Sequence, residues 1–461
     1  MARRARTRLL GALAGLAAAG SAASGGAASF QASYIAGSLD PTGRFVGGTE
    51  LRLLVAHGGR LYAGNGYWED RPGPEGVQGA QVLTLDSPGG RWRLDHQFDE
   101  RMPTGRPRNL AVSALFEAKF ATDGAGRALP QPAALLIAST WDLSGATRVI
   151  SRDDATRTWI ATTLAQDQPN PNFLPQIRSL AAHRDRVTGI DMVFAGQDPR
   201  GIFSGAYDPA VASRIRWRAA PELDLSRVST AGISGRNGYL RVPSFAEANG
   251  RLYATVGQQI FQRIDGAAPQ WRLVYTNQRP GHSETGLRGL TAIPGGAGDV
   301  LLAAVEGNAA RIVRIDPRDG SEATELDVDD FLGRAWGMRP SYVITAYNDM
   351  ARVGNTLLLG VMAFIPRSTP IPAGHSVVDV GYGQVESGAW YLVRTPDARY
   401  ALRQVTIASP QPLVATRTIL RSPFAGDAAI YFGGYDANKA PVHNTAWIAR
   451  ADLATALGAT P

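Results

Sequence analysis

Hydrophobic and polar positions alternate in short runs along this chain, and Gly-rich turns separate the runs. The first complete unit begins at Leu51 as LRLLVAHGGRLYAGNGY and, after a Gly/Pro loop, resumes as AQVLTLDSPGGRWRLDHQF, which ends at Phe98. Alternation that is bounded by turn residues is typical of β-strands, and the GG and SPGG segments are typical of tight turns. The unit therefore predicts three or four consecutive strands.

A pair of β-segments, the second ending on Asp, recurs along the whole chain. The first member of the pair is predicted at residues 60–66, 134–140, 191–197, 251–257, 300–306, 356–362 and 429–435. The second member is predicted at residues 80–86, 147–153, 201–208, 259–265, 310–316, 390–397 and 445–452. Each sheet built in this way has two apolar faces, which only neighbouring sheets in a closed ring can bury. We therefore predict an all-β fold, a seven-bladed β-propeller of four-stranded antiparallel blades.

The two ends of the chain complement each other in this prediction. After Asp452 only LATALGATP remains, and this segment does not have the pattern of a strand. The last sheet would therefore lack its outer strand. The segment FQASYIAG at residues 30–37 is the candidate for the missing strand, and we expect it to close the ring.

The first residues have the pattern of a secretory signal peptide. Four arginines precede an Ala/Leu/Gly run over residues 9–20, and the small residues SAASGGAAS follow. This order predicts a signal peptide at residues 1–28, with cleavage after Ala23 or Ala28. The apolar run is too short and too Ala-rich to span a bilayer. We expect residues 29–461 to form one propeller domain that is secreted or periplasmic, with no membrane partner.

Composition narrows the possible chemistry. The 461 residues include no Cys, which excludes disulfides, thiolate metal sites and a Cys nucleophile. The formal net charge of +7 includes the four leader arginines, so the mature chain carries about +3, and we expect no nucleic-acid partner. The His residues lack metal-like spacing, and a solvated bend explains Asp327, Asp329 and Asp330 better than a calcium loop does. We expect a monomer with no cofactor and no metal.

Three predicted hairpins share a spacing that resembles a known motif. Asp86 and Trp92, Asp153 and Trp159, and Asp265 and Trp271 are each six residues apart. The hairpins resemble the Asp-box of sialidase-type propellers, Ser-x-Asp-x-Gly-x-Thr-Trp, with one residue inserted in the turn. The resemblance implies that the Asp accepts backbone hydrogen bonds in the turn and that the Trp packs between adjacent sheets. The motif is structural, so it implies a propeller and not a sialidase activity.

An arginine recurs at the start of the predicted innermost strands, two residues before Leu or Ile. The instances are Arg52, Arg108, Arg178, Arg288 and Arg417, while Arg241 is displaced by about two positions, and Asn348, beside Asp349, takes the equivalent place in the sixth unit. A ring of guanidinium groups at the mouth of a channel would bind carboxylate, sulfate or phosphate. Alternatively, each Arg pairs with a carboxylate of a neighbouring unit, such as Glu50, Glu284 or Asp349, and ties the sheets together.

The long predicted loops gather on the face that carries these arginines. They cover residues 66–79, 166–176, 223–239, 278–286, 327–346 and 365–388, and the exception is 117–133. His282 and His375 both occur in this set of loops as Gly-His-Ser. Long loops on one rim favour a binding face, so both histidines join the arginines as candidate ligand-binding residues.

The segment LRVPSF resembles the Phe/Tyr-Arg-Ile-Pro motif of sialidases, whose Arg binds the carboxylate of sialic acid. The resemblance implies this role for Arg241, although the first position is Leu and the motif lies mid-chain. Tyr342 and Tyr347 lie in the region where a nucleophile would occur, but no catalytic residue is assigned. We expect an exported propeller that binds an anionic ligand, either an acidic glycan or a protein partner. The alternative is a hydrolase or lyase that acts on an anionic substrate.

Overall fold

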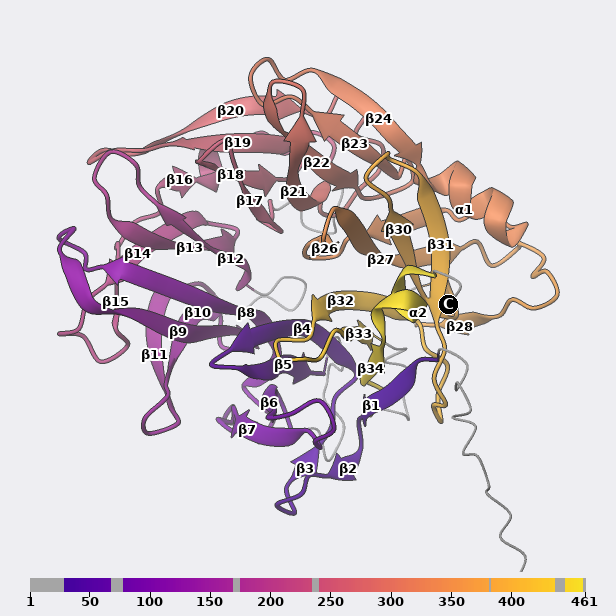
Figure 1. The fold of residues 1–461 in the computed structure, drawn as a ribbon, viewed down its shortest axis with the longest axis horizontal. Helices are drawn as coiled ribbons and strands as arrows, with labels where there is room; N and C mark the ends of the chain where they lie inside the picture. Colours follow the sequence, from indigo (N-terminus) through magenta and orange to yellow (C-terminus); the bar gives the residue numbers. More distant parts are fainter. Residues whose placement is uncertain are drawn as a thin grey trace, which may run out of the picture.

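The computed structural model describes residues 29–67, 78–168, 175–233, 240–380, 383–435 and 444–458. The chain is all-β, and its four-stranded antiparallel sheets surround a common centre in a β-propeller arrangement (Figure 1). The all-β propeller class predicted from the alternating pattern is therefore confirmed. The predicted signal peptide and the loop that contains Trp68 lie outside the described residues. Within the described ranges, no helix is long and apolar enough to cross a bilayer.

Consecutive strands form antiparallel meanders. The groups that follow one another from the first meander onward are β4 (Glu50–His57), β5 (Arg60–Gly66), β6 (Gln81–Leu85) and β7 (Arg93–Gln97); β8 (Asn109–Thr122), β9 (Ala128–Asp142), β10 (Ala146–Asp153) and β11 (Thr158–Gln166); β12 (Gln176–Arg184), β13 (Asp191–Asp198), β14 (Gly201–Tyr207), β15 (Ile215–Trp217) and β16 (Leu223–Asp224); β17 (Phe245–Ala248), β18 (Arg251–Val256), β19 (Gln259–Ile264) and β20 (Gln270–Thr276); and β21 (Leu287–Gly295), β22 (Gly298–Val305), β23 (Arg311–Ile315) and β24 (Glu322–Asp327).

The remaining strands are grouped around β27 (Thr356–Ile365) and β33 (Ile430–Tyr435). The strands that belong with β27 are β25 (Tyr342–Thr345), β26 (Ala351–Val353), β28 (Val377–Asp379), β29 (Gln384–Glu386), β30 (Ala389–Arg394) and β31 (Tyr400–Val405). Those that belong with β33 are β32 (Ala415–Arg421), β34 (Trp447–Ala451) and β1 (Gln31–Ile35). The short elements are the hairpin of β2 (Ser38–Leu39) and β3 (Phe45–Val46), a 3-10 turn at Leu225–Arg227, and helices α1 (Val328–Trp336) and α2 (Leu453–Leu457).

Each strand predicted from the recurring pair overlaps an observed strand, from 60–66 on β5 to 445–452 on β34. Four predicted loops are wrong in part. Loop 223–239 begins with β16 and the 3-10 turn, and loop 365–388 contains β28 and β29. Residues 117–133 are largely an extension of the β8–β9 hairpin, with Ala118 opposite Leu135 and Thr122 opposite Ala128. Residues 327–346 contain α1 and β25. Asp327 caps α1 by accepting a hydrogen bond from the Asp330 amide (3.0 Å), which explains the acidic bend as a helix start.

Hydrogen bonding also joins neighbouring meanders. Tyr435 pairs with Glu50, and Gly66 pairs with Ala111, so the groups of β33, β4 and β8 form one 12-stranded sheet. The connectivity therefore does not divide the chain into seven separate sheets. Gly66 permits this approach because a Cβ at this position would lie 2.3 Å from the Ala111 Cα.

The chain ends meet as the sequence predicts. β1 pairs antiparallel with β34, with Gln31 opposite Arg450 and Ile35 opposite Trp447. Phe30 adds an aromatic contact, since its ring centroid lies 5.4 Å from that of Phe432. The N-terminal strand therefore supplies the outer edge of the last group, and residues 453–457 form α2 and not a strand.

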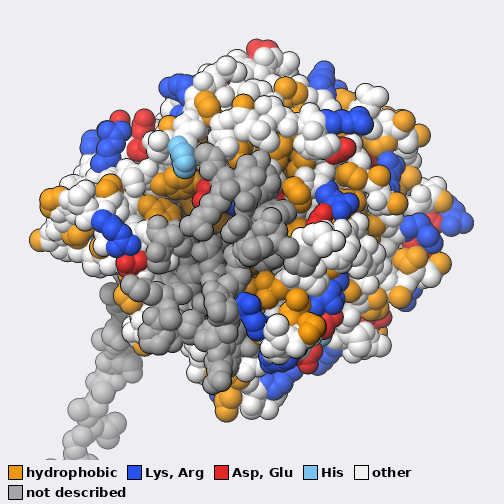
Figure 2. Space-filling model, turned by 180° about the vertical axis from the view of Figure 1, so that it is seen from behind, with side chains coloured by type: hydrophobic (Ala, Val, Ile, Leu, Met, Phe, Trp, Pro, Cys, Tyr) orange, Lys and Arg blue, Asp and Glu red, His pale blue; other side chains and the backbone are white. Residues whose placement is uncertain are grey.

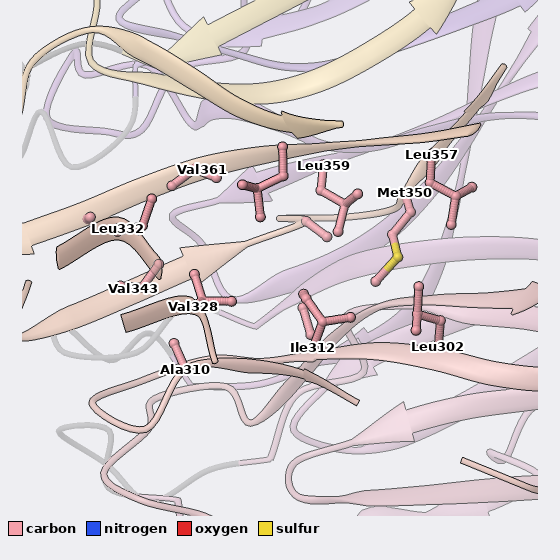
Figure 3. Close-up of a cluster of buried hydrophobic side chains, with 14 of the residues drawn as sticks. Leu302, Ala310, Ile312, Val328, Leu332, Val343, Met350, Leu357, Leu359 and Val361 are labelled. Carbon is pink, nitrogen blue, oxygen red and sulfur yellow. The ribbon is translucent and has the colours of Figure 1, made fainter. Parts of the chain in front are cut away.

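The core lies between adjacent sheets. In the cluster of Figure 3, Leu302 and Ile312 of one group are buried together with Leu357 and Leu359 of the next, and α1 adds Leu332. An apolar side chain buried in this way stabilises the fold by about 1.5–3 kcal/mol. The stability of each sheet therefore depends on its neighbours.

The Trp hairpins also contact adjacent sheets. The Trp92 Nε1 donates to Ser33 Oγ on β1 (2.9 Å), and the Trp159 Nε1 donates to Asp95 Oδ2 on β7 (3.1 Å). Trp92 is buried, whereas Trp159 and Trp271 are half-buried. Asp153 accepts hydrogen bonds from the amides of its turn, as the Asp-box resemblance implies. The other two do not follow this pattern, since Asp86 pairs with Arg60 and Arg93, and Asp265 pairs with Arg263.

Removal of β1 tests the closure of the ring. A chain that begins at Gly37 leaves the edge of β34 unpaired and removes the Phe30 and Ser33 contacts, so we expect its melting temperature to fall by many degrees. A chain that begins at Ser29 is the matched control and should melt like the full-length protein. Circular dichroism melting curves of the two chains make the comparison, and equal melting temperatures would show that β1 does not close the ring.

Candidate functional site

Most of the predicted arginines lie at register shifts near the starts of the strands that are closest to the centre in Figure 1. The pairing of β4 with β5 shifts between Leu51 and Leu53, and the shifts of β12 and β32 likewise bracket Arg178 and Arg417. A β-bulge turns the side chain at the irregular position away from the regular alternation. The bulges therefore explain how a strand that packs in the core can also direct an arginine toward the centre.

Three of these arginines surround one tyrosine. The guanidinium carbons of Arg417, Arg288 and Arg52 lie 3.9, 4.5 and 5.6 Å from the ring centroid of Tyr347. The Arg288 Nη1 donates to the Tyr347 carbonyl (2.9 Å), and the Arg52 Nη2 donates to its hydroxyl (3.4 Å). Cation–π attraction is strongest in desolvated sites, and all four residues are buried. We call these four residues the arginine cluster.

Buried carboxylates accompany the arginines. Glu50 lies 3.6 Å from the Arg52 Nε and 3.1 Å from the Arg417 Nε, and thus connects two neighbouring groups of strands. Its predicted role as a partner for an arginine of a neighbouring unit is confirmed. Arg178 pairs with Asp198 (2.5 Å) and Arg108 with Asp142 (3.0 Å). These two partners come from the second strand of the same group, which we did not predict.

Arg288 pairs in the same way with Glu306, immediately after β22. A signal for these partners is present in the sequence, since STWD, AGQD and AAVE place an acid at the end of three corresponding strands. The guanidinium groups are therefore not a bare ring. The alternative prediction, that each arginine pairs with a carboxylate of a neighbouring unit, describes the contact of Arg417 with Glu50. It is wrong for Arg108, Arg178 and Arg288, whose partners belong to their own groups.

The pKa of the Tyr347 hydroxyl depends on the charges inside the arginine cluster. Burial raises the pKa of its hydroxyl, but the Arg52 and Arg417 guanidinium groups outweigh this effect and lower the pKa to about 8. The pKa of a tyrosine falls only where negative charge is favoured. The cluster therefore favours an anion despite the nearby carboxylates.

A second set of polar groups borders the cluster at Arg288. Thr285 Oγ1 accepts hydrogen bonds from the Arg241 Nη1 (2.9 Å) and from the Arg288 Nη2 (2.8 Å). Arg241 also lies 3.8 Å from Glu284. The side chain of Arg241 is 13% exposed, whereas Arg288 is buried. Arg241 thus connects the cluster to solvent.

The Tyr342 hydroxyl donates to Glu306 and accepts a hydrogen bond from the Glu284 amide (2.9 Å). Burial raises the pKa of Tyr342, and the Glu306 carboxylate raises it further. Burial also raises the pKa of Glu306, but Arg288 and the Tyr342 hydroxyl reverse the effect, so that this pKa is lowered overall. The ring of His282 lies 6.5 Å from that of Tyr342 at the exposed edge. Tyr342 is among the residues predicted from the sequence, whereas its partner Glu306 is not.

Asn348 and Asp349 do not take the place of an arginine. The Asn348 Nδ2 donates to the Arg52 carbonyl (3.1 Å) and thereby holds the backbone of β4. Asp349 is exposed at the surface. Among the residues that the structure describes, no arginine forms an ion pair with Asp349.

His375 belongs to a different cluster, which lies in the insertion between β27 and β30. Its Nδ1 lies 3.0 Å from Glu386 Oε1, and its ring stacks on Trp390 at 6.4 Å. Glu386 is buried and accepts a hydrogen bond from the Trp390 indole. Burial raises the pKa of Glu386 to about 8. The contacts of His375 thus separate it from the arginine cluster.

No group of three or more His, Asp or Glu side chains in the described part of the chain is arranged to hold a metal ion. The arrangement thus offers buried guanidinium groups, two tyrosines and an exposed edge at Arg241 and His282.

The fold and these contacts define a β-propeller protein. No family model matches the chain, and no curated protein matches it either. Among solved structures, the chain is similar to the Niastella koreensis GH74 enzyme, with a TM-score of 0.45 and 12% identity over 90% of this chain and 55% of that one. It is also similar to the Cps50 (Swd1) β-propeller domain of Myceliophteria thermophila, with a TM-score of 0.43 and 10% identity over 84% and 95%.

A third similar structure is a putative exo-β-1,3-galactanase from Bifidobacterium bifidum, with a TM-score of 0.30 and 13% identity over 64% of this chain and 96% of that chain. At these identities the similarity concerns the fold alone. The function must therefore be argued from the site.

Glu386 gives a pH-dependent prediction. Its pKa is about 8 in the folded protein and ordinarily 4.5, so the folded state binds an additional proton between these values. Stability should therefore fall as the pH rises through this interval, by at most about 1.4 kcal/mol per pH unit. Glu386→Gln should flatten this part of the profile, measured as urea midpoints from about pH 5 to pH 9.

The matched control is Glu100→Gln. Arg148 lowers the pKa of Glu100 to about 2, so this carboxyl is ionised throughout the measured interval. The control should lower stability by a constant amount without changing the slope. Equal slopes in the wild-type and Glu386→Gln proteins would contradict the assignment of a buried neutral carboxyl.

Proposed function

We propose that the protein binds an anionic ligand, an acidic glycan, at the exposed edge of the arginine cluster, and that it does so without catalysis. One observation carries the proposal: three guanidinium groups surround the buried Tyr347, and two of them, Arg52 and Arg417, share the carboxylate of Glu50. This excess of guanidinium groups lowers the pKa of the Tyr347 hydroxyl and favours the carboxylate or sulfate of a ligand nearby. Specific binding then depends on the groups that solvent reaches.

Those groups are Arg241 and His282. Arg52, Arg288 and Arg417 are buried, so they act on a ligand through their field and not through direct contact. The exposed edge at Arg241 and His282 is shared with Thr285, which both Arg241 and Arg288 contact. A ligand carboxylate at this edge can accept charge-assisted hydrogen bonds from Arg241. Of the predicted arginine ring, only the side at Arg241 would therefore contact the ligand.

The face shown in Figure 2 has interspersed charges, with Lys and Arg side chains among Asp and Glu side chains. Interspersed charges produce weak fields at a distance, and salt screens them further. Attraction of an acidic glycan therefore has to come from particular groups.

A binding assay with Arg241→Gln tests the proposal. The variant should bind sialylated or uronic-acid glycans at least about tenfold more weakly, because a hydrogen bond to a charged group is lost. Its melting temperature should change little, since Arg241 is partly exposed. Arg108→Gln is the control, because this arginine belongs to the same predicted ring but pairs with buried Asp142. Unchanged affinity in Arg241→Gln, or no glycan binding by the parent protein at raised concentration and low salt, would reject the proposal.

The hydrogen bond between Tyr342 and Glu306 favours a second candidate, a glycosidase that acts on an acidic sugar. A carboxylate can take the phenolic proton when a tyrosine attacks, and Arg288 and Arg241 lie next to the pair. Tyr342→Phe distinguishes the two functions. Binding that survives while hydrolysis of a fluorogenic sialic acid glycoside is lost identifies an enzyme. If the parent protein does not hydrolyse this probe or a fluorogenic glucuronide, the sialidase-like candidate fails.

We also infer that the ring has seven blades. In this division the 12-stranded sheet separates into three blades, at the pairings of Tyr435 with Glu50 and of Gly66 with Ala111. The strands around β27 then form one blade with an insertion. We further propose that the protein is exported to the periplasm or the extracellular space, because residues 1–28 have the pattern of a signal peptide. We also propose that it is a monomer. An experimental density map would count the blades.

A further inference from the structure

A second basic site lies at the opposite ends of the strands. A cavity of about 200 Å³ is lined by residues that include Arg44, Arg60, Thr84, Arg93, Asp95 and Arg157. β4 runs from the arginine cluster at Arg52 to the turn before Arg60, so the length of this strand separates the two sites. The cavity is independent of the function proposed above.

Three separate segments build the cavity. Arg60 begins β5, and Thr84 on β6 lies directly opposite Arg93 on β7. Arg44 comes from the β2–β3 hairpin, which lies beside β7 in Figure 1. Arg157 comes from the turn between β10 and β11 of the next group. Four guanidinium groups thus converge from two neighbouring groups of strands and one hairpin.

The acidic groups near the cavity compensate these arginines only in part. Asp86 is shared between Arg60 (3.2 Å) and Arg93. Asp95 is held by the Arg152 guanidinium at 2.9 and 3.0 Å, and the same guanidinium also contacts Asp154, so these two acids share one arginine outside the set. The nearest carboxylate oxygen to Arg44 is on Asp40, at 3.7 Å. The cavity therefore keeps an excess of positive charge.

Arg157 contributes most to this excess. Its side chain is exposed, and within the described part of the chain it forms no ion pair or hydrogen bond. Its backbone is left-handed, with φ of 57°, which is uncommon for a residue other than Gly. The turn thus places a long cationic side chain at the cavity without a protein partner.

Thr84 provides an independent indication of a ligand. Its side chain is buried at 5% exposure, and its hydroxyl has no hydrogen-bond partner in the described structure. A buried polar group without a partner is rare and costs about 1–3 kcal/mol. Since Thr84 lines the cavity, a bound acceptor would satisfy this hydroxyl. Guanidinium groups and a hydroxyl are all hydrogen-bond donors, and an oxyanion can accept hydrogen bonds from each of them.

We propose that this cavity binds a small tetrahedral oxyanion, phosphate or sulfate, either as the free ion or as the end group of a small ester. Guanidinium groups bind phosphate and sulfate through paired hydrogen bonds, which favours these anions over halides. The volume fits one such group with a small substituent. The Thr84 hydroxyl is the neutral donor.

Isothermal titration with inorganic phosphate at constant ionic strength tests the site, and glucose 6-phosphate and inorganic sulfate form the second and third arms. Arg157→Gln should weaken binding at least about tenfold and leave the melting temperature of the ligand-free protein unchanged. Arg214→Gln is the matched control, since Arg214 is also an exposed hairpin arginine with a left-handed backbone, φ 60°. The control should bind like the parent. Thr84→Val should weaken binding while keeping or raising stability.

Tighter binding of glucose 6-phosphate than of inorganic phosphate would assign an ester as the ligand, and equal or weaker binding would assign the free ion. The proposal is overturned if the parent binds none of the three probes at millimolar concentration. It is also overturned if Arg157→Gln and Arg60→Gln both bind like the Arg214→Gln control. Loss of binding in Arg241→Gln with retention in Arg157→Gln would place the oxyanion at the other site.

Discussion

Burial of the apolar faces of each sheet against the next is the interaction on which this structure depends. A four-stranded sheet in this chain has no face that it can leave to solvent, and the buried clusters accordingly span neighbouring groups of strands. The end of the chain cannot complete the ring by itself, so β1 supplies the last edge. Two matched polar contacts add to the packing: His57 joins Glu117 and Asp154, and His183 joins Glu247 and Asp265, each from strand groups adjacent to its own.

The same packing explains the chemistry at the centre. Strands that converge bring their first residues close together, and arginines at those positions are removed from water. A buried guanidinium group is costly unless a carboxylate accompanies it, and Glu50, Asp198 and Glu306 are buried beside Arg52, Arg178 and Arg288. The compensation is incomplete, because Arg52 and Arg417 share Glu50, and the lowered pKa of Tyr347 agrees with this. A fold held together by apolar contacts does not require such a cluster, which is why we interpret it as functional.

The sequence predicts the strands because alternation and turns are local properties. It also predicts which arginines gather, since they recur at one position of a repeated unit. It does not predict how each arginine is neutralised: the bulge at Arg178 and the partner at Asp198 arise when two strands pair, and a pattern along one strand does not contain that pairing. Tyr347 was missed as the centre of the cluster because the path of residues 327–346 depends on α1 and on the pairing of β25 with β27.

Exposure decides which arginines can serve an external anion. At the centre, Arg52 and Arg417 are buried and share Glu50. Their charge attracts an anionic ligand, but a ligand that displaced Glu50 would leave its carboxylate buried and unpaired. At the opposite strand ends, Arg60, Arg93 and Asp86 are all partly exposed, so water or an oxyanion can replace their contacts at little cost. Buried arginines therefore set the electrostatic field of this propeller, and partly exposed ones such as Arg241 and Arg157 are the groups that can exchange ligands.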